Sequence, residues 1–233
     1  MHVDAPTLFL LPGFHGSAQL FEPLCAEFEG HLLARPLQFE SFDTIQAHVT
    51  DIDKALPNTD IFLLAESFSG LIALSLAAKS PLRFSGVILS CCFARTPMKL
   101  LATLGARLPQ KVYSASIFRS WILDHYCLNG VADPRLKKQI LEAINQVAPS
   151  VVRRRLRVLA ETNLTELLAH ISTPVLVLSA SYDRVVSSRF TRELRNKLPN
   201  ARHKEIAGPH LILQAAPNQA ATEIMNFIAS CKN

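Results

Sequence analysis

The sequence has 233 residues, of which 49% are hydrophobic and 18% are charged, and its net charge is +5. These values are typical of one globular domain with a large core, and they exclude an intrinsically disordered chain. No run reaches the roughly 18 uninterrupted apolar residues of a membrane span. The positive charge lacks the interleaved aromatic residues, or any known module, of a nucleic-acid-binding protein, so no nucleic-acid partner is expected.

The amino terminus and the cysteines both favour a cytoplasmic protein. The first six residues lack the basic start and apolar run of a signal peptide. The five cysteines are odd in number and form no C-x-x-C pair, so we expect reduced thiols rather than disulfides or a zinc site. No His or Cys cluster has metal-ligand spacing and no glycine-rich nucleotide motif occurs, so no cofactor is implied.

Predicted strands and helices alternate from the start of the chain. Residues 7–11 (TLFLL) predict a buried strand that runs into the glycine-rich loop Pro12-Gly13-Phe14-His15-Gly16-Ser17. Such a loop, at the carboxyl end of a parallel strand, is where open α/β sheets build their sites. A tight turn without chemistry is the alternative. The next segments predict a helix over 20–28, a strand over 31–39 and a helix over 44–56.

The stretch 61–79 (IFLLAESFSGLIALSLAAK) is the most informative in the chain. It predicts a buried strand over 61–64, an abrupt turn at Ser67 and an apolar helix. Small residues on both sides of the turn let the strand and helix backbones pass closely. The Ser67 hydroxyl would then project from the sheet beside the N–H of Phe68 at the helix start, where negative charge is favoured. Alternatively, Ser67 only caps the helix.

A strand is predicted over 87–93, and there the alternation stops. It resumes with a strand over 173–180, a helix over 192–198, a strand over 203–206 and a helix over 219–229. This order predicts an α/β protein with a mainly parallel central sheet, flanked by helices and joined by right-handed crossovers.

The segment between the two groups of strands contains no strand-like run. It predicts helices over 97–107, 116–125, 134–147, 149–160 and 164–169. Because it interrupts the sheet between two strands, residues 94–170 would form a helical lid over the strand carboxyl ends. Residues 1–93 and 171–233 would together form the core.

The predicted lid is basic. It contains twelve Lys and Arg against five Asp and Glu, a net charge of +7, which leaves −2 of the chain's +5 for the core. Such a surface attracts anionic partners, although a solvated charged face is the plainer interpretation. Arg155 differs from its neighbours because helical periodicity places it among apolar residues. It could extend to water, pair with a carboxylate or reach into a cleft, and we expect one of the first two.

The turn at Ser67 resembles the nucleophile elbow of the α/β-hydrolase superfamily. The chain departs from the family pattern at Ala65 and Ser69, where glycine is usual, and Ser69 would narrow the turn. Glu66 places an acid beside the nucleophile, which could disfavour anionic substrates or shift the pH optimum. We expect the antiparallel hairpin that opens many family members to be missing, because the strand over 7–11 is the first one predicted.

The resemblance implies a catalytic triad in the order Ser, acid, His. A serine hydroxyl needs a His as base, and a buried carboxylate fixes the tautomer of that His. Asp183, just after the strand over 173–180, and His210, before the last helix, match the family's acid and histidine loops. Taken singly, Asp183 could instead form an Asx turn and His210 could simply start a helix. The resemblance also assigns the backbone N–H groups of Phe14 and Phe68 to an oxyanion hole.

Within the superfamily the chain is most similar to small bacterial carboxylesterases, including the branch of pimeloyl-[acyl-carrier-protein] methyl ester esterase. This similarity implies hydrolysis of a carboxylic ester through an acyl-enzyme on Ser67. An acidic acyl carrier protein is a possible partner at the basic lid. A thioesterase, or a non-catalytic ligand-binding protein on the same scaffold, are the alternatives, because fold alone does not determine the reaction.

Overall fold

The computed structural model describes residues 5–58, 60–113, 120–129 and 133–232. Its centre is one six-stranded sheet in the order β2-β1-β3-β4-β5-β6, and every neighbouring pair of strands is parallel. The predicted α/β fold is therefore confirmed. The strands are β1 (Thr7–Leu11), β2 (Leu33–Pro36), β3 (Ile61–Glu66), β4 (Phe84–Ser90), β5 (Val175–Ala180) and β6 (Ala201–Ile206).

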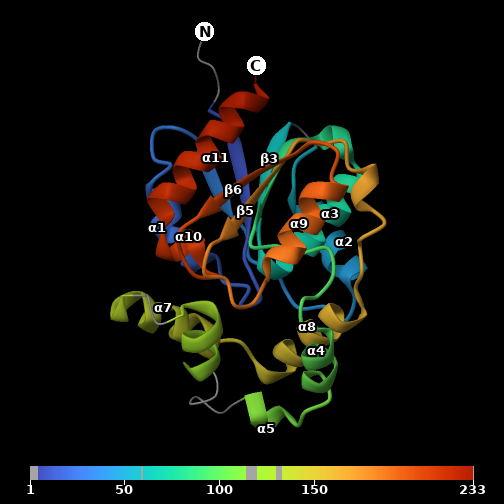
Figure 1. The fold of residues 1–233 in the computed structure, drawn as a ribbon, viewed down its shortest axis with the longest axis vertical. Helices are drawn as coiled ribbons and strands as arrows, with labels where there is room; N and C mark the ends of the chain where they lie inside the picture. The colour runs from blue at the N-terminus through green and yellow to red at the C-terminus, as the bar shows by residue number, and fades with distance from the viewer. Residues whose placement is uncertain (1–4, 59, 114–119, 130–132, 233) are drawn as a thin grey trace.

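Helices cover both faces of this sheet (Figure 1). One face carries α2 (Ile45–Ala55), α3 (Gly70–Lys79) and α9 (Ser188–Lys197). The other face carries α1 (Glu22–Ala26) and α11 (Pro217–Cys231), with the short α10 (Ile212–Ala215) just before α11. None of the described helices is long and apolar enough to cross a membrane.

The middle of the sheet is apolar because it is covered on both sides. All six residues of β3 are buried, as are all six of β5. Helix α3 is buried around most of its circumference, since it packs between the sheet and α2. A helix in that position has little solvent-exposed surface, which explains the nearly continuous apolar sequence of the segment 61–79.

The strand register brings separate parts of the sequence to one edge of the sheet. Glu66 at the end of β3 pairs with Ser90 at the end of β4. At the same edge Ser90 pairs with Leu178, and Ala180 pairs with Ile206. Because the strands are parallel, the loops that follow β1, β3, β4, β5 and β6 all leave from this edge.

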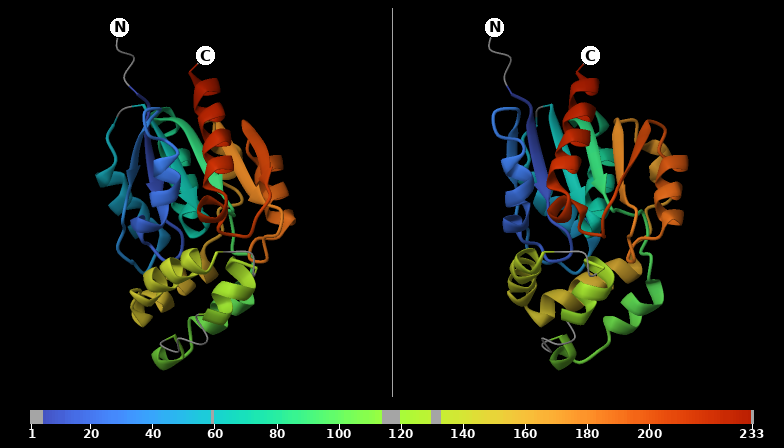
Figure 2. Two further views of the ribbon diagram at one scale, coloured as in Figure 1. Left: turned by 90° about the vertical axis from the view of Figure 1, so that its left-hand side faces the viewer. Right: turned by 60° about the vertical axis from the view of Figure 1, so that its left-hand side comes forward.

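The segment between β4 and β5 forms a group of helices beyond this edge (Figures 1 and 2). It contains α4 (Lys99–Gly105), α5 (Gln110–Tyr113), a π-helix (Leu123–Cys127), α7 (Pro134–Asn145) and α8 (Pro149–Glu161). Its two ends meet, because the N–H of Leu164 donates to the carbonyl of Ala94 at 2.8 Å and Arg95 pairs with Asn163. The predicted helix over 116–125 lies partly outside the described residues.

Several predicted bounds are wrong. β4 begins at Phe84 and ends at Ser90, three residues before the predicted limits. β2 covers only Leu33–Pro36 at the sheet edge, and α9 starts four residues before the predicted helix. The predicted helix over 164–169 is instead a short 3-10 turn, Leu168–His170.

Candidate active site

The turn after β3 holds Ser67 in an unusual backbone conformation. The φ angle of Ser67 is 51°, in the left-handed region that side chains other than glycine rarely adopt. The 3-10 turn Ser67–Ser69 leads directly into α3. A β-carbon at Gly70 would lie 2.6 Å from the Sγ of Cys92, so only glycine fits where the helix passes the neighbouring chain.

Ser69, which stands where glycine is usual in the superfamily, stabilises this turn with two side-chain hydrogen bonds. Its hydroxyl donates to the carbonyl of Leu11 at 2.8 Å, at the end of β1. It also accepts the N–H of Glu66 at 3.0 Å. The Ser69 hydroxyl therefore ties the turn at Ser67 to the strand that carries the glycine-rich loop.

Ser67, His210 and Asp183 lie together in one chain of hydrogen bonds. The Oγ of Ser67 is 2.9 Å from the Nε2 of His210, and the Nδ1 of His210 is 2.8 Å from the Oδ2 of Asp183. His210 is buried in the loop between β6 and α10. The structure thus brings together three residues that the sequence separates by as many as 143 positions.

Asp183 is oriented by the backbone of its own loop. Its Oδ1 accepts the N–H groups of Val185 and Val186, both at 2.8 Å, which leaves Oδ2 for His210. Burial raises the pKa of Asp183. The charge and hydrogen bond of His210, together with these two N–H groups, lower it by more than burial raises it, so the pKa lies below its ordinary value. The carboxylate is therefore ionised at neutral pH, and it accepts the Nδ1–H of His210.

An apolar cavity of about 670 Å³ opens onto Ser67 and His210. Its walls come from the glycine-rich loop, the turn after β3 and the helices between β4 and β5. Both Phe14 and Phe68 line it, with ring centroids 6.0 Å apart in an edge-to-face arrangement. Most of the other lining residues are aliphatic or aromatic, so the cavity suits an apolar ligand with a polar group near Ser67.

Glu66 holds the glycine-rich loop against the end of β3. Its Oε2 accepts the N–H of Gly13 at 3.2 Å and lies 3.3 Å from the Nε2 of His15. The Nδ1 of His15 accepts the N–H of Ser17 at 3.0 Å, so the ring carries its proton on Nε2 and donates it to Glu66. Burial raises the pKa of Glu66, but the hydrogen bond from His15, together with Gln214 and His210, leaves it below the ordinary value.

Arg155 is buried, as periodicity predicts, but its partner is not the expected one. Only 3% of this residue is exposed, so the guanidinium does not extend to water. Among the described residues, no carboxylate forms an ion pair with it. Its Nη1 instead donates to the carbonyl oxygen of Phe14. Both expected outcomes are therefore wrong: the side chain reaches inward from α8 to the glycine-rich loop, and it does not line the cavity.

Residues 37–210 match the family model of serine aminopeptidase S33. The chain belongs to this hydrolase family. Relatives of known structure share the fold of this S33 member at low sequence identity. The alignment with the structure of MenH from S. aureus covers 100% of this chain and 97% of the MenH chain, with a TM-score of 0.86 and 19% identity. The alignment with a thermophilic esterase from Thermogutta terrifontis covers 99% of this chain and 92% of the esterase chain, with a TM-score of 0.85 and 18% identity.

A curated relative of this S33 member is mouse monoglyceride lipase, which is 28% identical over 155 residues. The match covers 63% of the chain and 48% of the lipase, so the chain spans about half the length of that relative. An enol-lactonase from Burkholderia xenovorans LB400 is similar in fold, with a TM-score of 0.81 and 17% identity. Together these matches confirm the α/β-hydrolase resemblance.

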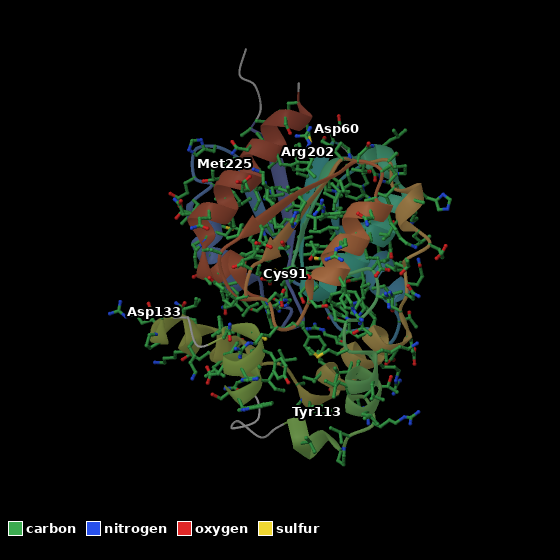
Figure 3. All side chains as sticks on the ribbon, in the orientation of Figure 1. Asp60, Cys91, Tyr113, Asp133, Arg202 and Met225 are labelled. Carbon is green, nitrogen blue, oxygen red and sulfur yellow. The ribbon has the colours of Figure 1, made fainter. Side chains whose placement is uncertain are left out.

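Cys91 is a neighbour of the Ser67–His210–Asp183 group that the sequence did not indicate. It follows β4, near the edge of the sheet that faces the inserted helices (Figure 3). One atom each from Cys91, Asp183 and His210 lie within 4.8 Å of one another. Burial and then the Asp183 carboxylate raise the pKa of the Cys91 thiol well above its ordinary value. A neutral thiol is a poor metal ligand, and both nitrogens of His210 are already hydrogen-bonded, so we assign no metal here.

Proposed function

We propose that the protein is a serine hydrolase that cleaves carboxylic esters through an acyl-enzyme on Ser67. The observation that supports this function is the hydrogen-bonded chain from Ser67 through His210 to Asp183 at the base of an apolar cavity. The S33 family match agrees with a hydrolase, and the similarity to a lipase and an esterase favours an ester as its substrate.

In the proposed mechanism, the Oγ of Ser67 attacks the ester carbonyl carbon while His210 takes its proton at Nε2. Asp183 stabilises the resulting imidazolium. The N–H groups of Phe14 and Phe68 donate to the carbonyl oxygen as it becomes negative. When the tetrahedral intermediate collapses, His210 gives the proton to the departing alcohol and an acyl-Ser67 ester remains.

Water completes the cycle. His210 takes a proton from a water molecule as its oxygen attacks the acyl carbon, and it returns that proton to the Oγ of Ser67 as the acid is released. Residues 94–170 act as a lid in this proposal, because their helices supply much of the cavity wall and shield the acyl chain from water. No step requires a cofactor.

An ester suits this cavity better than a peptide with a free amino terminus. Such a peptide needs a carboxylate to bind its ammonium group. Glu66 is the one acidic side chain among the described residues that line the cavity. It is 1% exposed, its Oε2 accepts hydrogen bonds from Gly13 and His15, and its Oε1, which has no partner among the described residues, is buried away from the cavity space.

A panel of p-nitrophenyl esters from acetate to decanoate tests this function. We expect kcat/KM to rise with acyl length, by up to about fourfold per methylene, because each buried methylene contributes about 0.8 kcal/mol. The increase should end where the cavity is filled. Matched thioesters and an aminoacyl amide in the same panel distinguish the reaction classes. If no ester is hydrolysed and a fluorophosphonate probe does not label the protein, a ligand-binding protein is the better account.

A carrier-bound ester is a second candidate substrate, favoured by the +7 charge of residues 94–170. Lys99 and Arg107 are exposed on and just after α4, whose Leu101 and Leu104 line the cavity. An acidic acyl carrier protein docked beside α4 could therefore deliver its acyl chain to Ser67.

Charge reversal at Lys99 and Arg107 tests the carrier proposal. We expect the double Glu variant to lose about tenfold in kcat/KM for a carrier-bound ester at low salt, because electrostatic steering is lost. Hydrolysis of a small free ester should not change. Lys54→Glu, on the distant helix α2, is the matched control. Equal turnover of free and carrier-bound esters, without a salt effect, would exclude a role for the carrier.

A further inference from the structure

Arg155 is a buried cation that forms no ion pair with a carboxylate among the described residues. It projects from α8, where its neighbours Arg154 and Arg157 are more exposed and lie 3.8 Å from the carboxylate of Asp43. Its own guanidinium donates to the carbonyl of Phe14 and lies over the ring of Phe39, 5.1 Å from the ring centroid. Among the described residues, its Nε has no hydrogen-bond partner.

Stability does not explain this arrangement. A buried guanidinium without a carboxylate is costly, and replacing it by an apolar side chain is commonly neutral or stabilising. Burial lowers the pKa of Arg155 to about 10, so it is still charged at neutral pH. The charge is therefore directed at the Phe14 carbonyl at a cost in folding free energy.

The contacts of Arg155 reach both residues of the proposed oxyanion hole. Its hydrogen bond restrains the peptide group that follows Phe14. The Phe39 ring beneath the guanidinium stacks on the ring of Phe68, with centroids 6.3 Å apart and an angle of 23° between the planes. Arg155 therefore holds the glycine-rich loop from α8, and it also contacts Phe39, whose ring packs on Phe68 in the turn after Ser67.

Glu66 restrains the same loop from the opposite side. It accepts the N–H of Gly13, so the backbone groups on both sides of the Phe14 N–H are held, one by an anion and one by a cation. The fit is tight at Gly16, which has a φ of 74° and where a β-carbon would lie 2.7 Å from the Nη2 of Arg155. The peptide groups before and after the Phe14 N–H are thereby restrained from two separate elements, and the Gly13 carbonyl between them accepts the N–H of Gly16 at 3.0 Å.

We propose that Arg155 is a positioning residue that sets the Phe14 N–H for catalysis, so that ester turnover requires α8 to be seated on the loop. The inference rests on the proposed function, in which that N–H stabilises the oxyanion. Arg155 touches neither the substrate nor the reacting atoms in this account. It acts through the Phe14 carbonyl. Through this contact α8, a helix of the inserted segment, becomes part of the catalytic arrangement.

The test is the variant Arg155→Met, assayed with a small p-nitrophenyl ester. We expect kcat to fall by about 10- to 100-fold, less than the loss of a whole oxyanion donor, while KM changes by less than about threefold. The affinity for an alkyl boronic acid, whose adduct with Ser67 mimics the tetrahedral intermediate, should fall in parallel with kcat. Arg155→Lys should give intermediate values, and the melting temperature of Arg155→Met should be unchanged or higher.

Controls separate positioning from misfolding. Rates are divided by the fraction of protein that a fluorophosphonate titrates, and Arg157→Met, on the exposed face of α8, should behave as the unsubstituted protein. A kcat within twofold of the unsubstituted value, or unchanged boronic acid affinity, in Arg155→Met would overturn this inference alone. If the unsubstituted protein neither hydrolyses esters nor is labelled, the proposed function fails as well.

Discussion

Replacing Ser67 by alanine is expected to lower kcat for a p-nitrophenyl ester by about 10⁴-fold or more, because the proposed acyl-enzyme can then no longer form. The Oγ of Ser67 lies 2.9 Å from the Nε2 of His210, which is the geometry that proton transfer needs. Alanine removes this nucleophile and leaves the cavity, the loop and the His210–Asp183 hydrogen bond in place. Steady-state kinetics and covalent labelling by a fluorophosphonate measure the effect.

The fold of this variant should survive, because alanine adopts a positive φ at a cost similar to that of serine. We therefore expect a melting temperature within a few degrees of the unsubstituted protein. Ser75→Ala is the matched control, because Ser75 lies on α3 and its hydroxyl donates only to the carbonyl of Leu71. Retention of more than a tenth of the activity in Ser67→Ala would show that Ser67 is not the nucleophile.

Replacing Asp183 by asparagine is expected to lower kcat by about 10³- to 10⁴-fold through the wrong His210 tautomer. The Oδ1 of Asp183 is committed to the N–H groups of Val185 and Val186. An asparagine would keep its oxygen on these donors and turn its NH₂ group toward His210. The Nδ1 of His210 would then have to accept, which leaves the proton on Nε2, where it blocks transfer from Ser67.

Two measurements check this explanation. The rate of fluorophosphonate labelling should fall by the same factor as kcat, since both require His210 as a base. Asp43→Asn is the control, because Asp43 is exposed and its ion pairs within the described part of the chain are the 3.8 Å contacts with Arg154 and Arg157. If Asp183→Asn kept its labelling rate, the orientation of His210 would not depend on Asp183.

Much of the fold could be predicted, because buried parallel strands produce continuous apolar runs. β1, β3 and β5 were all indicated in this way, and so was the turn at Ser67. Ser67, Asp183 and His210 each follow a strand at the same edge of the sheet, and a known order along the chain made them candidates. What the sequence could not supply was their distance from one another, which depends on the loops after β5 and β6.

The errors have local physical causes. The apolar run from Val87 to Phe93 looked like a strand, but the chain leaves the sheet at Cys91, where φ is 49°. Cys92 and Phe93 are buried outside the sheet, because Cys92 packs against Gly70 at the start of α3 and Phe93 lines the cavity. Nothing in the sequence marks a cysteine for a left-handed conformation.

Arg155 shows a second limit of sequence patterns. Periodicity placed it correctly among buried residues of α8, yet its partner is a backbone carbonyl 141 positions away. A carbonyl has no side-chain signature, so no pairing rule could have identified it. The pair formed by His15 and Glu66 was similarly invisible, although both residues lie in segments that already stood out.

The closure of the chain at Ala94 and Leu164 bears on how new specificities could be engineered in this protein. The chain enters and leaves the inserted segment side by side at this point, so the segment could be exchanged as a cassette without changing the path of the strands. A transplanted cassette would change which molecules are accepted. It would support full turnover only if it carried a cation able to reach the Phe14 carbonyl, and this requirement gives a simple criterion for choosing donors.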